Sequence, residues 1–250
     1  MLPKFLRLAA AAFVILGAVV ARAAEPAIIA KARARLAPDA VLDAVTSVHY
    51  VGSLAFTDPE NPVATRTAKV EFFLRKPAQQ RIVVANDKTI EVKALDGYDA
   101  WTRVTDATDP TKWSQTLLSA DQIRQLRADV WQNLSFFRGI EHVGGAVEDQ
   151  GPATVDGIAC EKLTFTHGGG IVYDRYFDVA TGRLVYTGND TNNIREEGEI
   201  VAGGIRFPQK IQISLKAGDK IVRQTITFEK ITVNEPLPDS LFALPALQAH

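Results

Sequence analysis

Apolar and polar residues alternate most regularly between residues 67 and 104, and this pattern predicts a set of antiparallel strands. In residues 68–75 every second side chain is apolar, which is the repeat of a strand with one apolar and one largely polar face. Residues 81–85 form a second apolar run, and residues 89–95 alternate again. Asp96-Gly97 is a hairpin signal, because glycine readily takes the positive φ that such a turn needs. Four antiparallel strands forming a curved sheet with one apolar face are therefore expected.

Helical periodicity is clearest over residues 120–137, where apolar side chains recur every three or four positions. Ser119 and Gln122 form a capping-box signal at its start, and Gly139 is expected to end it. An apolar stripe of this length must pack on another element, and the concave face of the sheet is the expected partner.

Two short helices and a strand are expected before the central strands. The first helix covers residues 26–36, with Arg33 largely off its apolar stripe, and the second covers residues 38–44. Residues 45–57 are expected to form a strand, in which Gly52 indicates a bulge or bend.

Beyond residue 143 the chain returns to a strand pattern. The expected strands cover residues 158–166, 171–178, 183–187, 195–201, 205–216 and 221–233, and Pro208 interrupts the strand 205–216. Their even spacing and the turns between them fit a mainly β meander sheet or open barrel with added helices.

The first 23 residues have the features of a secretory signal peptide. Lys4 and Arg7 give a basic start, residues 8–20 are apolar, and Ala21-Arg22-Ala23 is a small-x-small cleavage site. Cleavage is expected to leave residues 24–250 as a single soluble domain. An uncleaved membrane anchor is the alternative, but the apolar run is short for a spanning helix of about 20 residues.

Charge and cysteine content narrow the class of protein further. Loss of residues 1–23 removes three basic residues and moves the formal net charge from −1 to −4. A mildly acidic protein is a poor candidate for nucleic-acid binding. Cys160 is the only cysteine, so the chain has no internal disulfide. Its place in a strand pattern favours a small buried side chain over a nucleophile.

Residue patterns for catalysis or metal binding are weak. His167-Gly168-Gly169-Gly170 matches a lipase oxyanion motif in letters, but no Gly-x-Ser-x-Gly elbow accompanies it, and a hairpin tip is favoured. The acidic cluster Glu196-Glu197-x-Glu199 is expected on a solvated strand face rather than in a calcium site. The remaining histidines lack metal-site spacing. These patterns predict a protein that is not an enzyme, with no catalytic residues, no metal site and no cofactor.

Several stretches carry a family likeness through their order and spacing. They are Phe72-Phe73-Leu74-Arg75-Lys76-Pro77 with Arg81-Ile82-Val83, the Asp96-Gly97 hairpin followed by Trp101, Phe177-Asp178-x-x-Thr181-Gly182-Arg183-Leu184, Gly204-Ile205-Arg206-Phe207-Pro208-x-Lys210-Ile211, and residues 231–234 with 237–245. In these stretches the chain resembles the LolA/LolB-like family of periplasmic lipoprotein carriers, and more closely the outer membrane lipoprotein-sorting proteins.

The resemblance implies a strongly curved antiparallel half-barrel sheet, with helices over its concave face and a hydrophobic cavity between sheet and lid. It also implies a periplasmic location, acyl chains of lipoproteins or lipids as ligands, and a monomer that meets inner- and outer-membrane partner proteins. In the carriers an arginine beside the Arg/Lys-Pro strand end latches the lid. Arg75 and Lys76 occupy that place here.

Two functions remain open at this point. The first is a carrier or binding protein that buries acyl chains between the sheet and the helix 120–137, where each buried methylene contributes roughly 0.8 kcal/mol. The second is a sensor or interaction module on the same fold, with a core filled by side chains. The residues expected to face a ligand are Val70, Phe72, Leu74, Ile82, Val84, Ile90, Val92, Trp101, Leu126 and Val130. Ordinary core packing is the alternative role for these residues.

Overall fold

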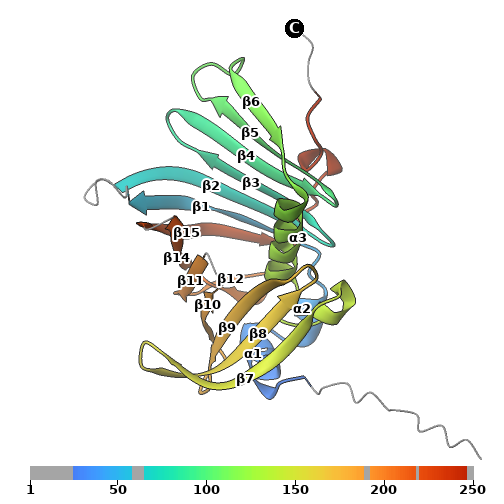
Figure 1. The fold of residues 1–250 in the computed structure, drawn as a ribbon, viewed down its shortest axis with the longest axis vertical. Coiled ribbons are helices and arrows are strands. Elements are labelled where there is room, and N and C mark those ends of the chain that lie inside the picture. Colours follow the sequence, from blue (N-terminus) through green and yellow to red (C-terminus); the bar gives the residue numbers. More distant parts are fainter. Residues whose placement is uncertain (1–24, 58–64, 189–191, 218–219, 247–250) are drawn as a thin grey trace, which may run out of the picture.

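A single curved sheet of 13 antiparallel strands dominates the computed structural model, which describes residues 25–57, 65–188, 192–217 and 220–246 (Figure 1). The strand order is β6-β5-β4-β3-β2-β1-β15-β14-β11-β10-β9-β8-β7. The two edge strands, β6 and β7, do not pair with each other, so the sheet is an open half-barrel, as predicted. The predicted signal peptide, residues 1–23, lies outside the described residues.

The strands and helices have the following bounds. The strands are β1 Ser47–Thr57, β2 Thr65–Arg75, β3 Gln79–Ala85, β4 Thr89–Asp96, β5 Asp99–Asp106, β6 Trp113–Leu117, β7 Ala146–Val155, β8 Ile158–His167, β9 Ile171–Asp178, β10 Leu184–Gly188, β11 Asn192–Glu197, β12 Ile200–Ala202, β13 Ile205–Phe207, β14 Lys210–Ala217 and β15 Lys220–Val233. The helices are α1 Ala27–Leu36, α2 Asp39–Asp43 and α3 Ala120–Leu134, with 3-10 turns η1 Ile140–Val143 and η2 Asp239–Leu241.

The central strands follow the predicted meander. Strands β2 to β5 pair in sequence order, each antiparallel to the next. Strand β1 pairs with β2 on one side and with β15 on the other, so the first and last strands of the chain are neighbours in the sheet. The predicted bulge at Gly52 is present, since the register with β15 shifts there. A Cβ atom at Gly52 would lie 2.1 Å from the Thr227 carbonyl oxygen, so only glycine fits.

Helix α3 begins as predicted but ends earlier. Ser119 and Gln122 form the capping box at its start. The helix stops at Leu134, and the prediction that it continues to residue 137 and ends at Gly139 is wrong. Phe136 and Phe137 instead have φ values of 50° and 73°, a conformation that bulky residues rarely adopt. This sharp turn sends the two rings into separate apolar cores.

Two predicted strands are divided in the structure. The segment 205–216 is interrupted at Pro208, with β13 before the break and β14 after it. The segment 195–201 splits at Gly198, which has a φ of 65°. β11 lies before the break in the large sheet, and β12 lies after it and pairs only with β13 in a small two-stranded sheet. A local alternation pattern does not reveal that two halves of a segment have different partners.

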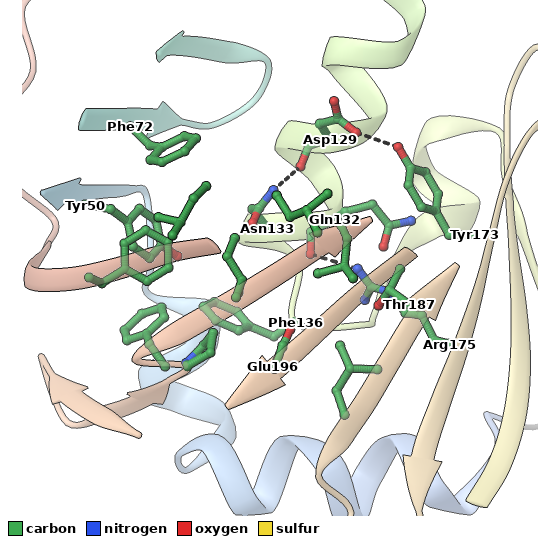
Figure 2. A pocket seen from close by; sticks show the side chains of 18 of the residues that line it. Tyr50, Phe72, Asp129, Gln132, Asn133, Phe136, Tyr173, Arg175, Thr187 and Glu196 are labelled. Atoms are coloured by element: carbon green, nitrogen blue, oxygen red, sulfur yellow. Dashed lines mark hydrogen bonds between the residues drawn. The ribbon is translucent and has the colours of Figure 1, made fainter. Parts of the chain in front are cut away.

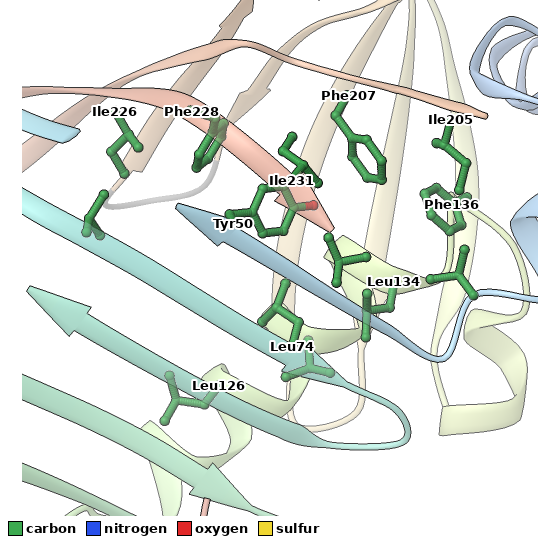
Figure 3. Packing of buried hydrophobic residues seen from close by; sticks show 14 of the residues in the cluster. Tyr50, Leu74, Leu126, Leu134, Phe136, Ile205, Phe207, Ile226, Phe228 and Ile231 are labelled. Atoms are coloured by element: carbon green, nitrogen blue, oxygen red, sulfur yellow. The ribbon is translucent and has the colours of Figure 1, made fainter. Parts of the chain in front are cut away.

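Buried side chains form cores on both faces of the sheet. The largest lies on the concave face under α3, where Leu126 and Leu134 pack with Leu74, Tyr50 and Phe228 (Figure 3). A second core joins α1 to the concave face of β8 and β9. A third, smaller core contains Val92, Ala94 and Trp101. Burial of each large apolar side chain contributes about 1.5–3 kcal/mol, so α3 is held mainly by its apolar stripe.

Candidate ligand-binding cavity

A cavity of about 450 Å³ lies between the concave face of the sheet and α3 (Figure 2). Its lining comes from α1, α3 and many strands, including β1 to β3 on one side and β9 to β11 on the other. The volume falls within the roughly 300–1,000 Å³ that is typical of small-molecule sites. The lining has two chemically different parts.

The first part is an apolar wall built from the middle of the sheet. Register explains its composition, because residues paired across antiparallel strands project to the same face. Tyr50 pairs with Phe72, and Phe72 pairs with Ile82. The Tyr50 ring lies 4.9 Å from the Phe228 ring, measured between centroids. The apolar wall comprises Tyr50, Phe72, Leu74, Ile82, Ile211, Ile213, Ile226 and Phe228.

The second part is a polar wall where α3 faces β9, β10 and β11. It comprises Asp129, Gln132, Asn133, Tyr173, Arg175, Thr187 and Glu196. The Tyr173 hydroxyl donates to Asp129 Oδ1 at 2.5 Å (Figure 2). The same hydroxyl accepts from Gln125 Nε2. Burial raises the pKa of both the Asp129 carboxyl and the Tyr173 phenol. These contacts fix α3 against β9.

Arg175 carries a buried positive charge in the polar wall. Its side chain is only 5% exposed, and its guanidinium lies 4.9 and 5.1 Å from the ring centroids of Phe137 and Phe165. Nη2 donates a 3.4 Å hydrogen bond to the Gln132 carbonyl oxygen, while Nε and Nη1 have no partner among the described residues. Burial lowers the pKa of Arg175 to about 10, so the group stays charged at neutral pH.

Glu196 is the acidic group of the polar wall. Burial raises its pKa to about 7, although Arg175 and Arg183 act in the opposite direction. Glu196 lines the cavity and is only partly exposed, so the prediction that the cluster 196–199 lies on a solvated face is wrong for this residue. Glu197, on the opposite face of the strand, does bond outward, to Lys210 and Gln212. Alternation along β11 separates the two neighbours.

The predicted ligand-facing residues divide into three groups. Phe72, Leu74 and Ile82 line the cavity. A second group packs in or against the core under α3 without lining the cavity, and it contains Val70, Val84, Leu126 and Val130. These four side chains pack α3 against the sheet, which is the alternative role of core packing.

The third group, Ile90, Val92 and Trp101, lies on the opposite, convex face. Val92 pairs with Val83. Val83 is next to the cavity-lining Ile82 in β3, so it and Val92 point to the opposite face of the sheet. The 86–88 turn sets this register, and strand alternation alone could not reveal it. The C-terminal segment covers Trp101, whose Nε1 donates to the Phe242 carbonyl oxygen at 3.2 Å. Ile90 is 37% exposed.

The two latch candidates also lie away from α3. Arg75 binds the C-terminal segment, through the Leu237 carbonyl oxygen and the Asp239 carboxylate. The Lys76 side chain forms no hydrogen bond or ion pair to α3 within the described residues, and partial burial lowers its pKa.

Other arginines connect α3 to its surroundings. Arg127 Nη1 donates to the Gly97 carbonyl oxygen at 2.7 Å. The prediction that Arg33 lies off the apolar stripe of α1 is wrong, because the side chain is buried. Arg33 donates to the Phe136 carbonyl oxygen at 3.1 Å. It also pairs with Asp39 and Asp43, at 2.7 and 2.6 Å. A buried guanidinium needs such partners, which explains its position between α2 and the end of α3.

Sequence reasoning missed the polar wall, although one signal was available. Tyr173, Arg175 and Phe177 are alternate residues of one strand, so they share a face. An arginine between two aromatic residues on an apolar face is a candidate for a buried functional charge. The long-range partners, Gln132 and Glu196, had no comparable local signal.

The other chemical candidates have structural roles. Cys160 is buried in β8, as its strand pattern predicted. His167 is the last residue of β8 and is also buried, with its Nε2 2.5 Å from Gln132 Nε2, while Gly168 to Gly170 form the turn. Across the ranges that the structure describes, no three histidine, cysteine or acidic side chains are grouped to hold a metal ion.

Comparison with known proteins identifies the fold. No protein-family model and no curated protein matches the sequence. A LolA superfamily protein from Nitrosomonas europaea matches with a TM-score of 0.57 and 12% identity, over 87% of this chain and 96% of that one. A DUF1329 family protein from Desulfovibrio piger gives 0.55 and 12%, with the same coverage. A protein named as an outer membrane lipoprotein-sorting domain, from Vibrio parahaemolyticus, gives 0.54 and 8%, over 86% and 95%. The chain therefore has the LolA-like fold that its sequence resemblance predicted.

Proposed function

We propose that this chain is a periplasmic carrier or binding protein that holds acyl chains of lipoproteins or lipids between the curved sheet and α3. The observation that carries the proposal is the cavity of about 450 Å³ beside the apolar wall. Each methylene placed there would contribute roughly 0.8 kcal/mol. The names of two proteins with similar structures, a LolA superfamily protein and an outer membrane lipoprotein-sorting domain, support the same function.

The alternative is a sensor or interaction module on the same fold. That function needs no internal ligand, and side chains would fill the space between sheet and helix. The unfilled volume beside Phe72, Ile213 and Phe228 favours acyl binding over this alternative.

The proposed route of the protein follows from its N-terminus. Residues 1–23 would direct export and be removed, and the exported chain would act as a monomer between inner- and outer-membrane partner proteins. None of the helices in the described part of the chain has the length and apolar character to span a bilayer.

Loading and release would require α3 to move away from the sheet. Its polar attachments include the bonds from Arg127 to Gly97, from Arg33 to Phe136, and between Tyr173 and Asp129. Water can replace these bonds at modest cost, since a typical hydrogen bond contributes only about 0.5–1.5 kcal/mol net. Separation of the apolar stripe from the sheet would be the larger cost, and a bound acyl chain would offset part of it.

Native mass spectrometry of residues 24–250 purified from a bacterial periplasm, followed by solvent extraction, tests the proposal. Stoichiometric co-purifying lipid is the expected result, together with uptake of added fatty acid by delipidated protein. A chain that carries no lipid and takes up neither fatty acid nor lipopeptide would refute acyl binding and leave the interaction module.

A further inference from the structure

We infer that the cavity takes an amphiphile with an anionic head group, a carboxylate or a phosphate, whose charge pairs with Arg175 while its acyl chain lies along the apolar wall. This inference rests on the proposed function and adds the chemical class and orientation of the ligand. It follows from the division of the cavity into two walls (Figure 2).

The register of the sheet joins the two walls in a single row. Arg175 pairs with Thr187, Thr187 with Ile194, and Ile194 with Ile213. All four side chains line the cavity. Neighbouring strands lie about 4.8 Å apart, so this row runs roughly 14 Å from the guanidinium end to the apolar wall. An amphiphile can therefore reach Arg175 with its head while its chain contacts Ile213 and the aromatic side chains beyond it.

Arg175 has the chemistry of an incomplete anion site. It is more than nine-tenths buried, and the structure gives it no ion pair within the described residues. Two of its three guanidinium nitrogens lack a hydrogen-bond partner there. A guanidinium only donates hydrogen bonds, and a buried charge without a partner is costly. A ligand carboxylate or phosphate would supply the missing acceptors and the opposite charge.

The titratable groups around Arg175 do not neutralise its charge fully, so the site can accept one anionic ligand group. Tyr173 on the same strand stays neutral, because burial and Asp129 raise its pKa. His167 on β8 also stays neutral, since burial and Arg175 lower its pKa to about 4. Asp129 on α3 is bonded to Tyr173. Glu196 on β11 is the competing acid, and the rise of its pKa to about 7 makes its charge easy to lose when an anion binds.

The matched probes are palmitate and hexadecanol, which share a chain length and differ in head-group charge. Their dissociation constants are measured on the delipidated chain, residues 24–250, at pH 8 by displacement of a fluorescent fatty acid. The wild-type protein is expected to prefer palmitate by roughly 10- to 100-fold, the gain from charge-assisted hydrogen bonds. Hexadecyl phosphate in the same assay separates phosphate from carboxylate as the preferred head.

Substitutions test whether Arg175 causes the preference for palmitate over hexadecanol. Arg175→Gln is expected to bind palmitate and hexadecanol equally. Arg206→Gln is the matched control, because Arg206 also lines the cavity but already pairs with Glu199 at 3.1 Å. Glu196→Gln removes the competing acid and is expected to strengthen palmitate binding at least threefold at pH 8 without affecting hexadecanol. This variant keeps the test decisive if Arg175→Gln does not fold.

The outcomes separate this inference from the proposed function. Equal binding of palmitate, hexadecyl phosphate and hexadecanol by the wild-type protein would overturn the anionic head group and leave acyl binding intact. An equal loss of preference in Arg206→Gln would overturn the assignment to Arg175. If none of the three probes binds, the proposed function itself fails.

Discussion

The two walls of the cavity are built from the same kind of strand but differ in how much each depends on single residues. The apolar wall contains eight side chains of similar character, so its chemistry would survive many conservative changes. The polar wall depends on a few groups whose charges and hydrogen bonds are mutually adjusted, such as Arg175 with Glu196 and Tyr173 with Asp129. Under the proposed function, the apolar wall would supply affinity, while the polar wall would supply orientation and selectivity.

The largest expected effect comes from a charge placed in the apolar wall. Ile213→Asp should weaken fatty-acid binding by roughly 100-fold or more, because a carboxylate without a partner would be buried against the acyl chain. Ile213→Val is the control and should bind within a few-fold of the wild type. Displacement of a fluorescent fatty acid measures both. A folded Ile213→Asp protein with normal affinity would mean that this wall does not face the ligand.

The next effect is on the free energy of unfolding, and it compares two residues of α3, one beside each wall. Leu134 is 1% exposed in the core beside the apolar wall, so Leu134→Ala should lower the free energy of unfolding by about 2–5 kcal/mol. Gln132→Ala on the polar side should cost only about 1 kcal/mol, the value of its hydrogen bond to His167. Urea denaturation gives both values, and Leu134→Met should cost less than about 1.5 kcal/mol. A larger loss for Gln132→Ala than for Leu134→Ala would mean that polar contacts, rather than the apolar stripe, hold α3 to the sheet.

A smaller effect is the pH dependence of stability that Glu196 of the polar wall should cause. The pKa of Glu196 rises from its ordinary 4.5 to about 7 in the folded chain, so its protonated form is favoured. The raised pKa means that protonated Glu196 does not destabilise the fold, so stability is unaffected below pH 4.5. Stability is lost as the pH rises through 7 and the folded chain has to hold the ionised carboxylate. Glu196→Gln stays neutral at all pH values, and it should therefore be more stable than the wild type at pH 8, on the order of 1 kcal/mol, with the difference vanishing near pH 4.

Glu197→Gln is the matched control for this pH effect. The hydrogen bond from Lys210 lowers the pKa of Glu197, so its contribution is present above pH 4.5 and is lost as the pH falls below that value. The control should thus lose a little stability at pH 8 rather than gain it. Thermal unfolding at pH 4 and pH 8 distinguishes the two variants, and a gain of stability in both would argue against a raised pKa of Glu196 as the cause.

The smallest effect is expected on the convex face. Ile90→Thr should change fatty-acid affinity by less than about twofold and the free energy of unfolding by about 0.5 kcal/mol or less, because the side chain is exposed. Ile82→Thr, at a cavity-lining position, should weaken binding several-fold by loss of apolar contact. Equal effects of the two substitutions would contradict the assignment of the two faces.

Local rules accounted for much of the fold. The alternation in residues 68–75, the Asp96-Gly97 hairpin, the Ser119 capping box and the Gly52 bulge all appear where the sequence predicted them. Each depends on neighbouring residues only, so it can be recognised without knowledge of distant partners. Part of the candidate site followed from the same rules, because Phe72 and Leu74 share the face of an alternating strand and both line the cavity.

The sequence by itself therefore determined the central strands, the start of α3 and which residues share a face within one strand. Only the tertiary structure decided how those faces combine. The pairing of Val83 with Val92 placed Trp101 under the C-terminal segment, and the approach of α3 to β9 and β11 made Arg175 and Glu196 parts of one wall. The physical reason is that alternation specifies relative direction along a strand, whereas the absolute face depends on register with partners far away in the chain.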